Sequence, residues 1–249
     1  MTTRVLFIRH GETTWNRVKR IQGHIDIPLA ASGLAQAERL AARLASRMNG
    51  RQPARLPTQS AYEARSAGAI DAQPPRSVLD AIYSSDLQRA QQTAQPTASA
   101  LGLPLQLCTG LRERAYGVFQ GHDSGEIAAR FPDAYAVWQT RDPGFAPDGG
   151  ESSRGFFHRV LHAVASIVAA HPGGHIACVT HGGVLDCIYR HARGLSLEAP
   201  RDYPLLNASI NTVDFDQAGR ASIVAWADVE HLHGESEDDG LSPASAASR

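Results

Sequence analysis

Cysteine is scarce in this sequence: Cys108, Cys178 and Cys187 are the three in 249 residues, and no two of them form a Cys-x-x-Cys pair. Their odd number and spacing argue against a disulfide scaffold and a structural zinc site, and indicate buried thiols in a reducing cytoplasm. Long apolar runs are also missing. A membrane-spanning helix needs about 20 apolar residues, and the N-terminal run Val5–Ile8 is too short for the core of a signal peptide. We therefore expect a cytoplasmic protein with no membrane partner.

An excess of one charge sign is missing as well. The chain has 24 Lys and Arg residues against 25 Asp and Glu residues, which gives a formal net charge of -1. Without a positive field, nucleic acid is an unfavourable partner. The absence of a G-x-G-x-x-G loop and of a Walker lysine argues against a nucleotide-binding loop. What the sequence does have is 43% hydrophobic residues, enough for one large core.

Apolar runs alternate with helical stripes along most of the chain. Val5–Ile8 is a continuous apolar run, typical of a strand that is covered on both faces. Strands alternating with helices predict an α/β fold: a three-layer sandwich with a mostly parallel central sheet flanked by helices. The expected strands are 5–8, 78–83, 104–108, 175–180, 209–215 and 221–227, and the expected helices include 34–44, 87–100, 152–170 and 184–192.

Polar residues in front of the expected helices are candidate N-caps. Ser32 precedes the stripe Leu34–Leu44, whose apolar side chains we expect to face the core. Ser85 or Asp86 is expected to cap the next helix. Asp123, with a glutamate three residues later, resembles a capping box.

Two segments have no apolar period. Residues 50–76 are rich in Pro, Gln, Ala and Arg, and we expect a flexible insertion there. Residues 234–249 are acidic and then rich in Ser and Ala, which predicts a disordered tail. The chain has no internal repeat. Its length and hydrophobic content suit one large core, and we expect a single domain over residues 1–233.

Several expected strands end in side chains suited to phosphate or proton chemistry. Arg9 and His10 end the first strand, His181 ends a later one, and each histidine is followed by glycine. Because the cleft of such a sheet lies beyond the carboxyl ends of its strands, these residues can meet at one edge. A neutral imidazole is a good nucleophile near pH 7, and a neighbouring guanidinium attracts phosphate and disfavours the imidazolium. One strand-end histidine alone is more often structural, but two of the same design favour function.

Arg89 and Glu113 are further candidates. Arg89 falls in the first turn of the helix after the second strand, where free N–H groups also favour an anion. Glu113 lies in a loop and is the best placed carboxylate to protonate a leaving oxygen. Taken alone, each residue is more often an exposed surface charge.

Five blocks in order, FIRHGETTWN, SSDLQRAQQTA, LRERAYGVFQG, GGES and VTHGG, resemble the motifs of the histidine phosphatase superfamily, also called the phosphoglycerate mutase-like family. The resemblance runs from about Arg4 to Phe215, apart from the insertion. It implies that His10 becomes transiently phosphorylated and that Glu113 is the proton donor. It also implies a set of phosphate and substrate contacts, which are Arg9, Asn16, Gln22, Gly23, Arg89, His181 and Gly182.

The chemistry implied by this resemblance needs no metal and no other cofactor. Two arginines and a histidine offset the nearly two negative charges of a phosphomonoester, and fixed donors stabilise the transition state. His10 attacks in line and splits the reaction into two steps. The sequence therefore predicts a metal-independent phosphomonoesterase that acts on a small phosphorylated metabolite.

A phosphoglycerate mutase is the alternative within the family. Cofactor-dependent mutases carry Glu-Arg-His-Tyr-Gly around the donor glutamate, whereas this chain has Ala115 in place of the histidine. Their lysine-bearing segment is replaced by GHDSGE, and the PDGGES block at 147–152 resembles the phosphatase branch. These differences favour the phosphatase.

Two other classes of protein are weaker alternatives. An inactive module that binds a phosphorylated ligand would be expected to have lost His10 or Glu113, and both are present. A metal protein would need more ligands than the pair His158 and His162 or the pair at 231 and 233 provides.

The substrate and the oligomeric state are the least constrained features. Variable loops select the leaving group, and here these are expected at 115–148. Arg20, Arg114 and Trp138 are candidates for contacting it. The sequence leaves a homodimer open.

Overall fold

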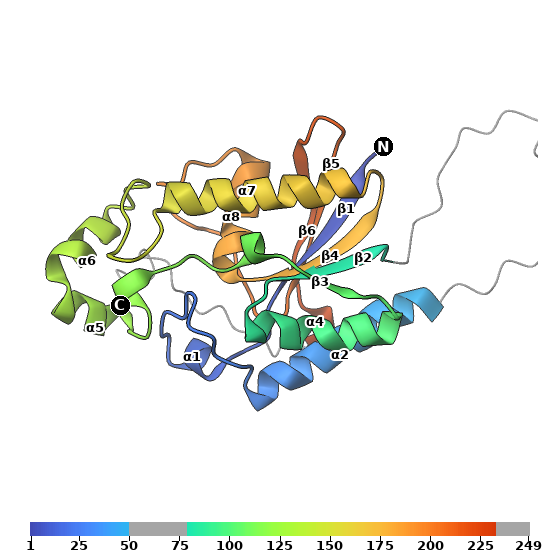
Figure 1. Cartoon of the computed structure of the whole chain (residues 1–249), viewed down its shortest axis with the longest axis horizontal. Coiled ribbons are helices and arrows are strands. Elements are labelled where there is room, and N and C mark those ends of the chain that lie inside the picture. Colours follow the sequence, from blue (N-terminus) through green and yellow to red (C-terminus); the bar gives the residue numbers. More distant parts are fainter. Residues whose placement is uncertain (50–78, 233–249) are drawn as a thin grey trace, which may run out of the picture.

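The structure is a computed structural model and describes residues 1–49 and 79–232. These residues contain a six-stranded sheet with the order β3-β2-β4-β1-β5-β6 (Figure 1). The pairs β1–β4, β4–β2 and β2–β3 are parallel, whereas β5 and β6 are added antiparallel. The prediction of a mostly parallel sheet is confirmed. The strands are β1 (Thr3–Arg9), β2 (Ala81–Ser84), β3 (Leu105–Leu107), β4 (His175–Thr180), β5 (Ile210–Phe215) and β6 (Ala221–Asp228).

Helices cover both faces of the sheet, which gives the predicted three layers (Figure 1). On one face, α2 (Ala31–Asn49) packs beside α4 (Gln88–Leu101), and on the other α7 (Ser153–Ala170) packs beside α8 (Gly182–Arg193). The short helix α1 (Thr14–Arg17) follows β1. Single 3₁₀ turns occur at Thr109–Leu111, Gly117–Phe119 and Glu230–Leu232.

The sequence of β1 explains why the core has two sides. Val5 and Phe7 belong to the apolar cluster that includes residues of α7 and α8. Leu6 and Ile8 belong to the cluster that includes residues of α2 and α4. Because successive side chains of a strand point to opposite faces, a strand covered on both sides needs a continuous apolar run.

A third apolar cluster lies outside the sandwich, under α5 (Ser124–Arg130) and α6 (Pro132–Gln139). The capping box predicted at Asp123 is confirmed, since its side chain accepts from the N–H of Glu126 at 2.9 Å. Both helices lie beyond one end of the sheet, to the left in Figure 1. The buried residues of this cluster are Ile21, Phe119, Ile127 and Trp138.

The start of α2 differs from the prediction. The helix begins at Ala31, so Ser32 lies inside its first turn and is not the N-cap. The Ser32 hydroxyl donates instead to the Glu12 carboxylate, a contact that the local pattern does not contain. Leu34 is 47% exposed, whereas Leu40 is buried. The stripe therefore faces the core only from its second turn on.

The start of α4 also differs. Leu87 is its N-cap and makes no side-chain capping hydrogen bond, so the predicted cap at Ser85 or Asp86 is wrong. The carboxylate of the distant Asp26 accepts from the first helical N–H, that of Gln88, at 2.7 Å. The Asp86 carboxylate pairs with Arg112 instead, at 2.5 and 2.7 Å. The Ser85 hydroxyl lies 2.8 Å from Nε2 of His181. Both residues thus make side-chain contacts with distant parts of the chain, and neither is the N-cap of α4.

The expected insertion at 50–76 and tail at 234–249 lie outside the described residues. Within 1–49 and 79–232, no helix is both long enough and apolar enough to cross a membrane.

Candidate active site

A cavity lies at the carboxyl ends of β1 and β4. The end of β1 contributes two lining residues, and the first turn of α8 follows directly after β4. Two loops and the first turn of α4 complete this end of the cavity. The structure thus brings together seven of the residues proposed from the sequence, which are Arg9, His10, Gln22, Gly23, Arg89, Glu113 and Gly182.

His10 is buried, with 3% of the residue exposed. Its Nδ1 lies 2.7 Å from the carbonyl oxygen of Gly11. Because that oxygen only accepts, Nδ1 carries the proton and Nε2 keeps its lone pair. Burial lowers the His10 pKa well below its ordinary value, and the charges of Arg89 and Arg9 lower it further. The ring is therefore neutral at pH 7.

His181 is fully buried beside His10, with ring centroids 5.2 Å apart, and is not itself among the lining residues. Burial lowers its pKa well below the ordinary value, and the charge of Arg89 adds to this effect. The hydroxyl of Ser85 contacts its Nε2 at 2.8 Å. His181 is thus a neutral group, and its contact with the Ser85 hydroxyl holds it beside His10.

Asn16 does not line the cavity. Its side-chain oxygen accepts from the backbone N–H of Thr13 at 2.9 Å and from the Thr13 hydroxyl at 2.8 Å. These contacts close the capping box of α1, directly after the Arg-His-Gly-Glu motif. A direct contact between Asn16 and phosphate remains a prediction.

Arg89 is fully buried and holds the loop after α1. Its Nη2 donates to the carbonyl oxygen of Gly23 at 2.7 Å, and its Nη1 donates to that of Ile25 at 3.1 Å. Burial lowers its pKa to about 10, so the guanidinium remains charged at pH 7. Within the described residues, Arg89 Nε has no hydrogen-bond partner, and neither has Oε1 of Gln22. Since buried donors are rarely left unpaired, Arg89 Nε is suited to an anion.

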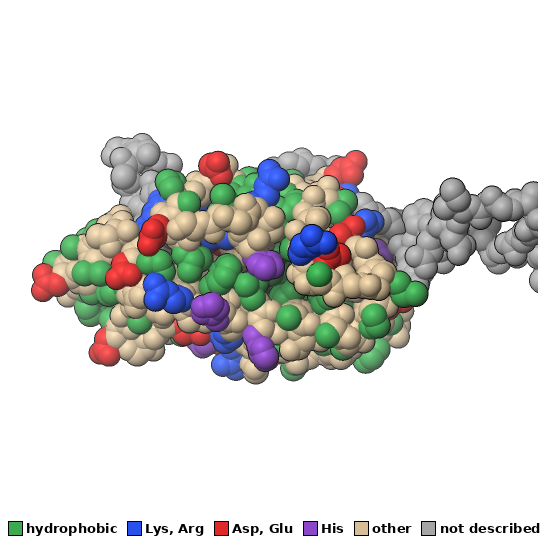
Figure 2. Space-filling model, turned by 90° about the horizontal axis from the view of Figure 1, so that it is seen from above, with side chains coloured by type: hydrophobic (Ala, Val, Ile, Leu, Met, Phe, Trp, Pro, Cys, Tyr) green, Lys and Arg blue, Asp and Glu red, His purple; other side chains and the backbone are tan. Residues whose placement is uncertain are grey.

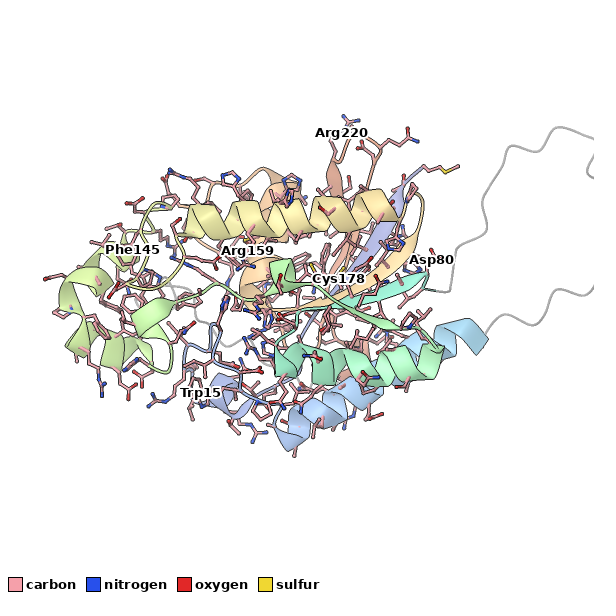
Figure 3. The ribbon with its side chains drawn as sticks, in the orientation of Figure 1. Trp15, Asp80, Phe145, Arg159, Cys178 and Arg220 are labelled. Atoms are coloured by element: carbon pink, nitrogen blue, oxygen red, sulfur yellow. The ribbon has the colours of Figure 1, made fainter. Side chains whose placement is uncertain are left out.

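Glu113 is fixed through both its side chain and its backbone. Its Oε2 accepts from the N–H of Gly183 at 3.0 Å, and its Oε1 accepts from the N–H of Arg114 at 2.8 Å. Its carbonyl oxygen accepts from Nε2 of His24 at 2.8 Å and from Nη2 of Arg159 at 3.1 Å. Arg159, labelled in Figure 3, extends from α7 toward this loop. The carboxylate is therefore presented to the cavity by four residues from separate elements.

Sequence reasoning missed most of this support. Arg159 also donates to both oxygens of Glu151, at 2.7 and 2.8 Å, and Glu151 in turn accepts from the N–H of Ala115. The GGES block contained a signal for Glu151. Nothing in the sequence pairs it with Arg159 or places His24 against Glu113, because those contacts join separate loops and helices.

The three residues suggested to contact the leaving group differ in whether they line the cavity and in whether their side chains are already paired. Arg20 pairs with Glu126 at 2.7 Å and does not line the cavity. Trp138 lines it and is 8% exposed. Arg114 also lines it, but its guanidinium is occupied by three acceptors and braces the surrounding loops. Those acceptors are the Glu151 carbonyl at 2.9 Å, the Ser153 hydroxyl at 2.8 Å and the Phe145 carbonyl at 3.1 Å.

The other histidines considered from the sequence do not line the cavity. His158 and His162 are exposed on α7, and Figure 2, which views the molecule from the α7 side, shows histidine side chains at the surface. His231 is buried in the last 3₁₀ turn, and residue 233 lies outside the described ranges. Across the part of the chain that the structure describes, no three His, Cys, Asp or Glu residues form a group suited to a metal ion.

A neutral histidine beside two buried arginines, with a carboxylate on the same cavity, defines a class of protein: an α/β enzyme of phosphoryl transfer. The comparison with family models gives the particular family. The chain belongs to the histidine phosphatase superfamily, branch 1, whose model matches residues 5–52 and 46–229. The family, the fold and the enzyme class predicted from the sequence are confirmed.

Curated relatives cover almost the whole chain. A metal-independent phosphoserine phosphatase of Arabidopsis thaliana is 36% identical over 233 residues, which cover 92% of this chain and 83% of the relative. Phosphoglycerate mutase-like protein 4 of the same plant is 33% identical over 231 residues, covering 92% and 86%. Among solved structures, YhfR of Bacillus stearothermophilus has a TM-score of 0.73 at 30% identity, covering 92% of this chain and 99% of that one.

Proposed function

We propose that this chain hydrolyses a small phosphorylated metabolite, without a metal ion, through a phosphohistidine on His10. One observation carries the proposal. The His10 ring is neutral, has its Nε2 lone pair available and lines a cavity together with two buried arginines. A nucleophile and the charges that offset a phosphate are thus present at one place.

In the first step, the phosphate group lies against Arg9 and Arg89. Nε2 of His10 attacks phosphorus as the bond from phosphorus to the leaving oxygen breaks, and that oxygen takes a proton from Glu113. The charge that spreads over the phosphoryl oxygens is stabilised by donors already in place. The Arg89 Nε–H, which has no partner among the described residues, is one such donor.

In the second step, water attacks the phosphohistidine. Glu113, now ionised, takes a proton from that water, and His10 leaves as neutral imidazole. The two backbone N–H groups on the Glu113 carboxylate keep it pointed at the cavity in both steps. The phosphatase relative at 36% identity supports this reaction.

A mutase remains the second candidate, supported by the relative named as phosphoglycerate mutase-like. A screen of phosphate release across sugar phosphates, phosphoglycerates, phosphoserine and nucleotides, with a parallel mutase assay, decides between the two reactions. Phosphate released to water supports the phosphatase, and isomerised phosphoglycerate without release supports the mutase.

The nucleophile is tested by His10→Ala. This variant should abolish turnover and phosphoenzyme labelling and keep the far-ultraviolet circular dichroism spectrum of the parent. His162→Ala is the matched control, since His162 is exposed on α7, and it should keep both activities. Labelled phosphohistidine at the parental level in His10→Ala would contradict the assignment. Absence of labelling in the parent would favour an inactive binding module.

A further inference from the structure

The cavity lining carries more positive than negative charge apart from Arg9, Arg89 and Glu113, which are used in the proposed reaction. The remaining lining residues include four guanidinium groups and two carboxylates. A cavity with such lining attracts a ligand that has a second negative charge. These charged residues are Arg114, Arg141, Arg190, Arg201, Asp142 and Asp186.

Most of these charges already have partners. Arg190 Nε donates to Oδ2 of Asp186 at 2.8 Å, and the other oxygen of Asp186 accepts from the Tyr203 hydroxyl at 2.6 Å. The Arg114 guanidinium is bound by the three acceptors described above. Oδ1 of Asp142 accepts from a backbone N–H two residues later, at 2.8 Å. These groups form the cavity wall. Because they already make hydrogen bonds within the protein, a substrate would have to compete with those partners to bind them.

Arg141 is different. It is partly buried and lines the cavity, and within the described residues its guanidinium has no hydrogen bond, ion pair or aromatic contact. A partly buried guanidinium without a partner is suited to bind an anionic group of a ligand.

The backbone of Arg141 supports a role for this side chain. Its φ is +60°, in the left-handed region, where a residue other than glycine costs about 1 kcal/mol or more. Glycine would satisfy this turn without that cost. Backbone strain of this kind occurs preferentially at ligand-binding and active sites. Lys19, Ala208 and Ala227 also have positive φ, so the argument for Arg141 depends on its place in the cavity lining and on its unpaired guanidinium among the described residues.

The surroundings hold the turn in this conformation. The N–H of Arg141 donates to the carbonyl oxygen of Trp138 at 3.1 Å, which ends α6. On the other side, the Phe145 carbonyl accepts from Nη2 of Arg114 at 3.1 Å. Phe145 is labelled in Figure 3 on this loop beside α6. Residue 141 is thus presented to the cavity by a turn that is anchored at both ends.

We propose that Arg141 is a specificity-determining residue, which binds a second anionic group of the substrate while the first phosphate lies at Arg9 and Arg89. The second group is a carboxylate or another phosphate. The inference rests on the proposed phosphatase activity and adds the substrate class: phosphomonoesters with two anionic groups.

Matched substrate pairs test this proposal. 3-Phosphoglycerate and glycerol 3-phosphate share a three-carbon chain and differ in one carboxylate, and fructose 1,6-bisphosphate and fructose 6-phosphate differ in one phosphate. A charge-assisted contact contributes about tenfold or more in kcat/KM. The parent should prefer the member with two anionic groups in at least one pair by that factor. Preference in the first pair identifies a carboxylate, and preference in the second identifies a phosphate.

Arg141→Gly is the informative variant, because it removes the guanidinium and relieves the backbone. It should lose the preference, keep kcat/KM for the member with one anionic group, and keep or raise the melting temperature. Arg141→Lys should retain part of the preference. Arg130→Ala is the matched control, since Arg130 is exposed on α5 and outside the cavity. It should leave both substrates unaffected.

The outcomes separate this inference from the proposed function. If the parent hydrolyses both members of each pair equally, or if Arg141→Gly keeps the preference, the inference is wrong and the phosphatase assignment stands. If Arg141→Gly lowers kcat/KM equally for both members of a pair and also lowers the melting temperature, Arg141 is structural and the inference is again wrong. If the parent forms no phosphohistidine with any of these substrates or with p-nitrophenyl phosphate, both proposals fail.

Discussion

The backbone N–H of Gly183 donates to Oε2 of Glu113 at 3.0 Å, and a Cβ built on Gly183 would lie 2.1 Å from Oε1 of the same carboxylate. The first turn of α8 therefore leaves room for Glu113 only because residue 183 has no side chain. A helix N-terminus also favours a carboxylate electrostatically. The second glycine of the VTHGG block thus sets the position of the proposed proton donor.

Gly183→Ala should displace this carboxylate, and the Phe156 ring, whose Cε1 would lie 3.1 Å from the added Cβ, should shift slightly. The fold should stay intact, since the one group closer than 3.0 Å is the end of the Glu113 side chain. We expect kcat/KM for an alkyl phosphate to fall by about 10²-fold, the usual effect of a misplaced catalytic group. Gly125→Ala is the control, because the nearest atom to its added Cβ is Oδ1 of Asp123 at an ordinary 3.4 Å. Unchanged hydrolysis by Gly183→Ala would show that the position of Glu113 is not critical.

Arg89→Ala should lower kcat/KM by about 10²-fold or more, because a charge-assisted donor is removed from the transition state. It also leaves the carbonyl oxygens of Gly23 and Ile25 without their donor. Arg89→Lys should recover activity only in part, since an ammonium cannot bridge two carbonyls and also reach a phosphate. Steady-state kinetics with p-nitrophenyl phosphate measures both variants. Full recovery by lysine would mean that only net charge matters at this position.

Glu113→Gln keeps the shape of the side chain and removes its proton. Hydrolysis of alkyl phosphates should slow by about 10²–10⁴-fold, the range of general acid catalysis. p-Nitrophenol leaves nearly unaided, so its release should show a burst followed by slow turnover as phosphohistidine accumulates. Rapid-mixing kinetics distinguishes the two phases. Equal slowing of phosphorylation for both leaving groups would move the acid role to another group.

Stability should fall as the pH drops below about 6.5. Burial lowers the pKa of His10 and of His181 in the folded state, so over this range the unfolded chain binds more protons than the folded chain. Each histidine contributes a slope of up to about 1.4 kcal/mol per pH unit. Urea unfolding at pH 7.5, 6.5 and 5.5 measures the loss, and His181→Asn should reduce its slope. The carboxylates with lowered pKa values, such as Glu151, titrate at lower pH and do not interfere. A flat profile would contradict the burial of neutral histidines.

Local patterns of the sequence were enough for the sandwich and for much of the site. The apolar run of β1 predicted a strand covered on both faces, and Leu6 and Phe7 indeed face opposite layers. Arg9 and His10 follow that strand directly, so the strand itself delivers them to the edge of the sheet. The period of side chains along a strand and the place where it ends are properties of neighbouring residues, and a sequence displays them.

Contacts between distant segments could not be predicted in this way. Glu113 and Gly183 are 70 residues apart, and their hydrogen bond depends on how a loop packs against α8. Ser85 was expected to cap a helix, but its hydroxyl contacts His181, the residue directly after the neighbouring strand β4. The left-handed backbone at residue 141 could not be predicted, because this position is an arginine and not a glycine.

The sequence by itself therefore determined the elements, their order and the residue types at the sheet edge, because periodicity and strand ends are local. Only the tertiary structure decided which groups hold Glu113, which arginines of the cavity are paired, and that the Arg141 guanidinium has no partner within the described residues. Those outcomes depend on the packing of loops from different parts of the chain. The free energy of such packing comes from contacts that no short stretch of sequence contains.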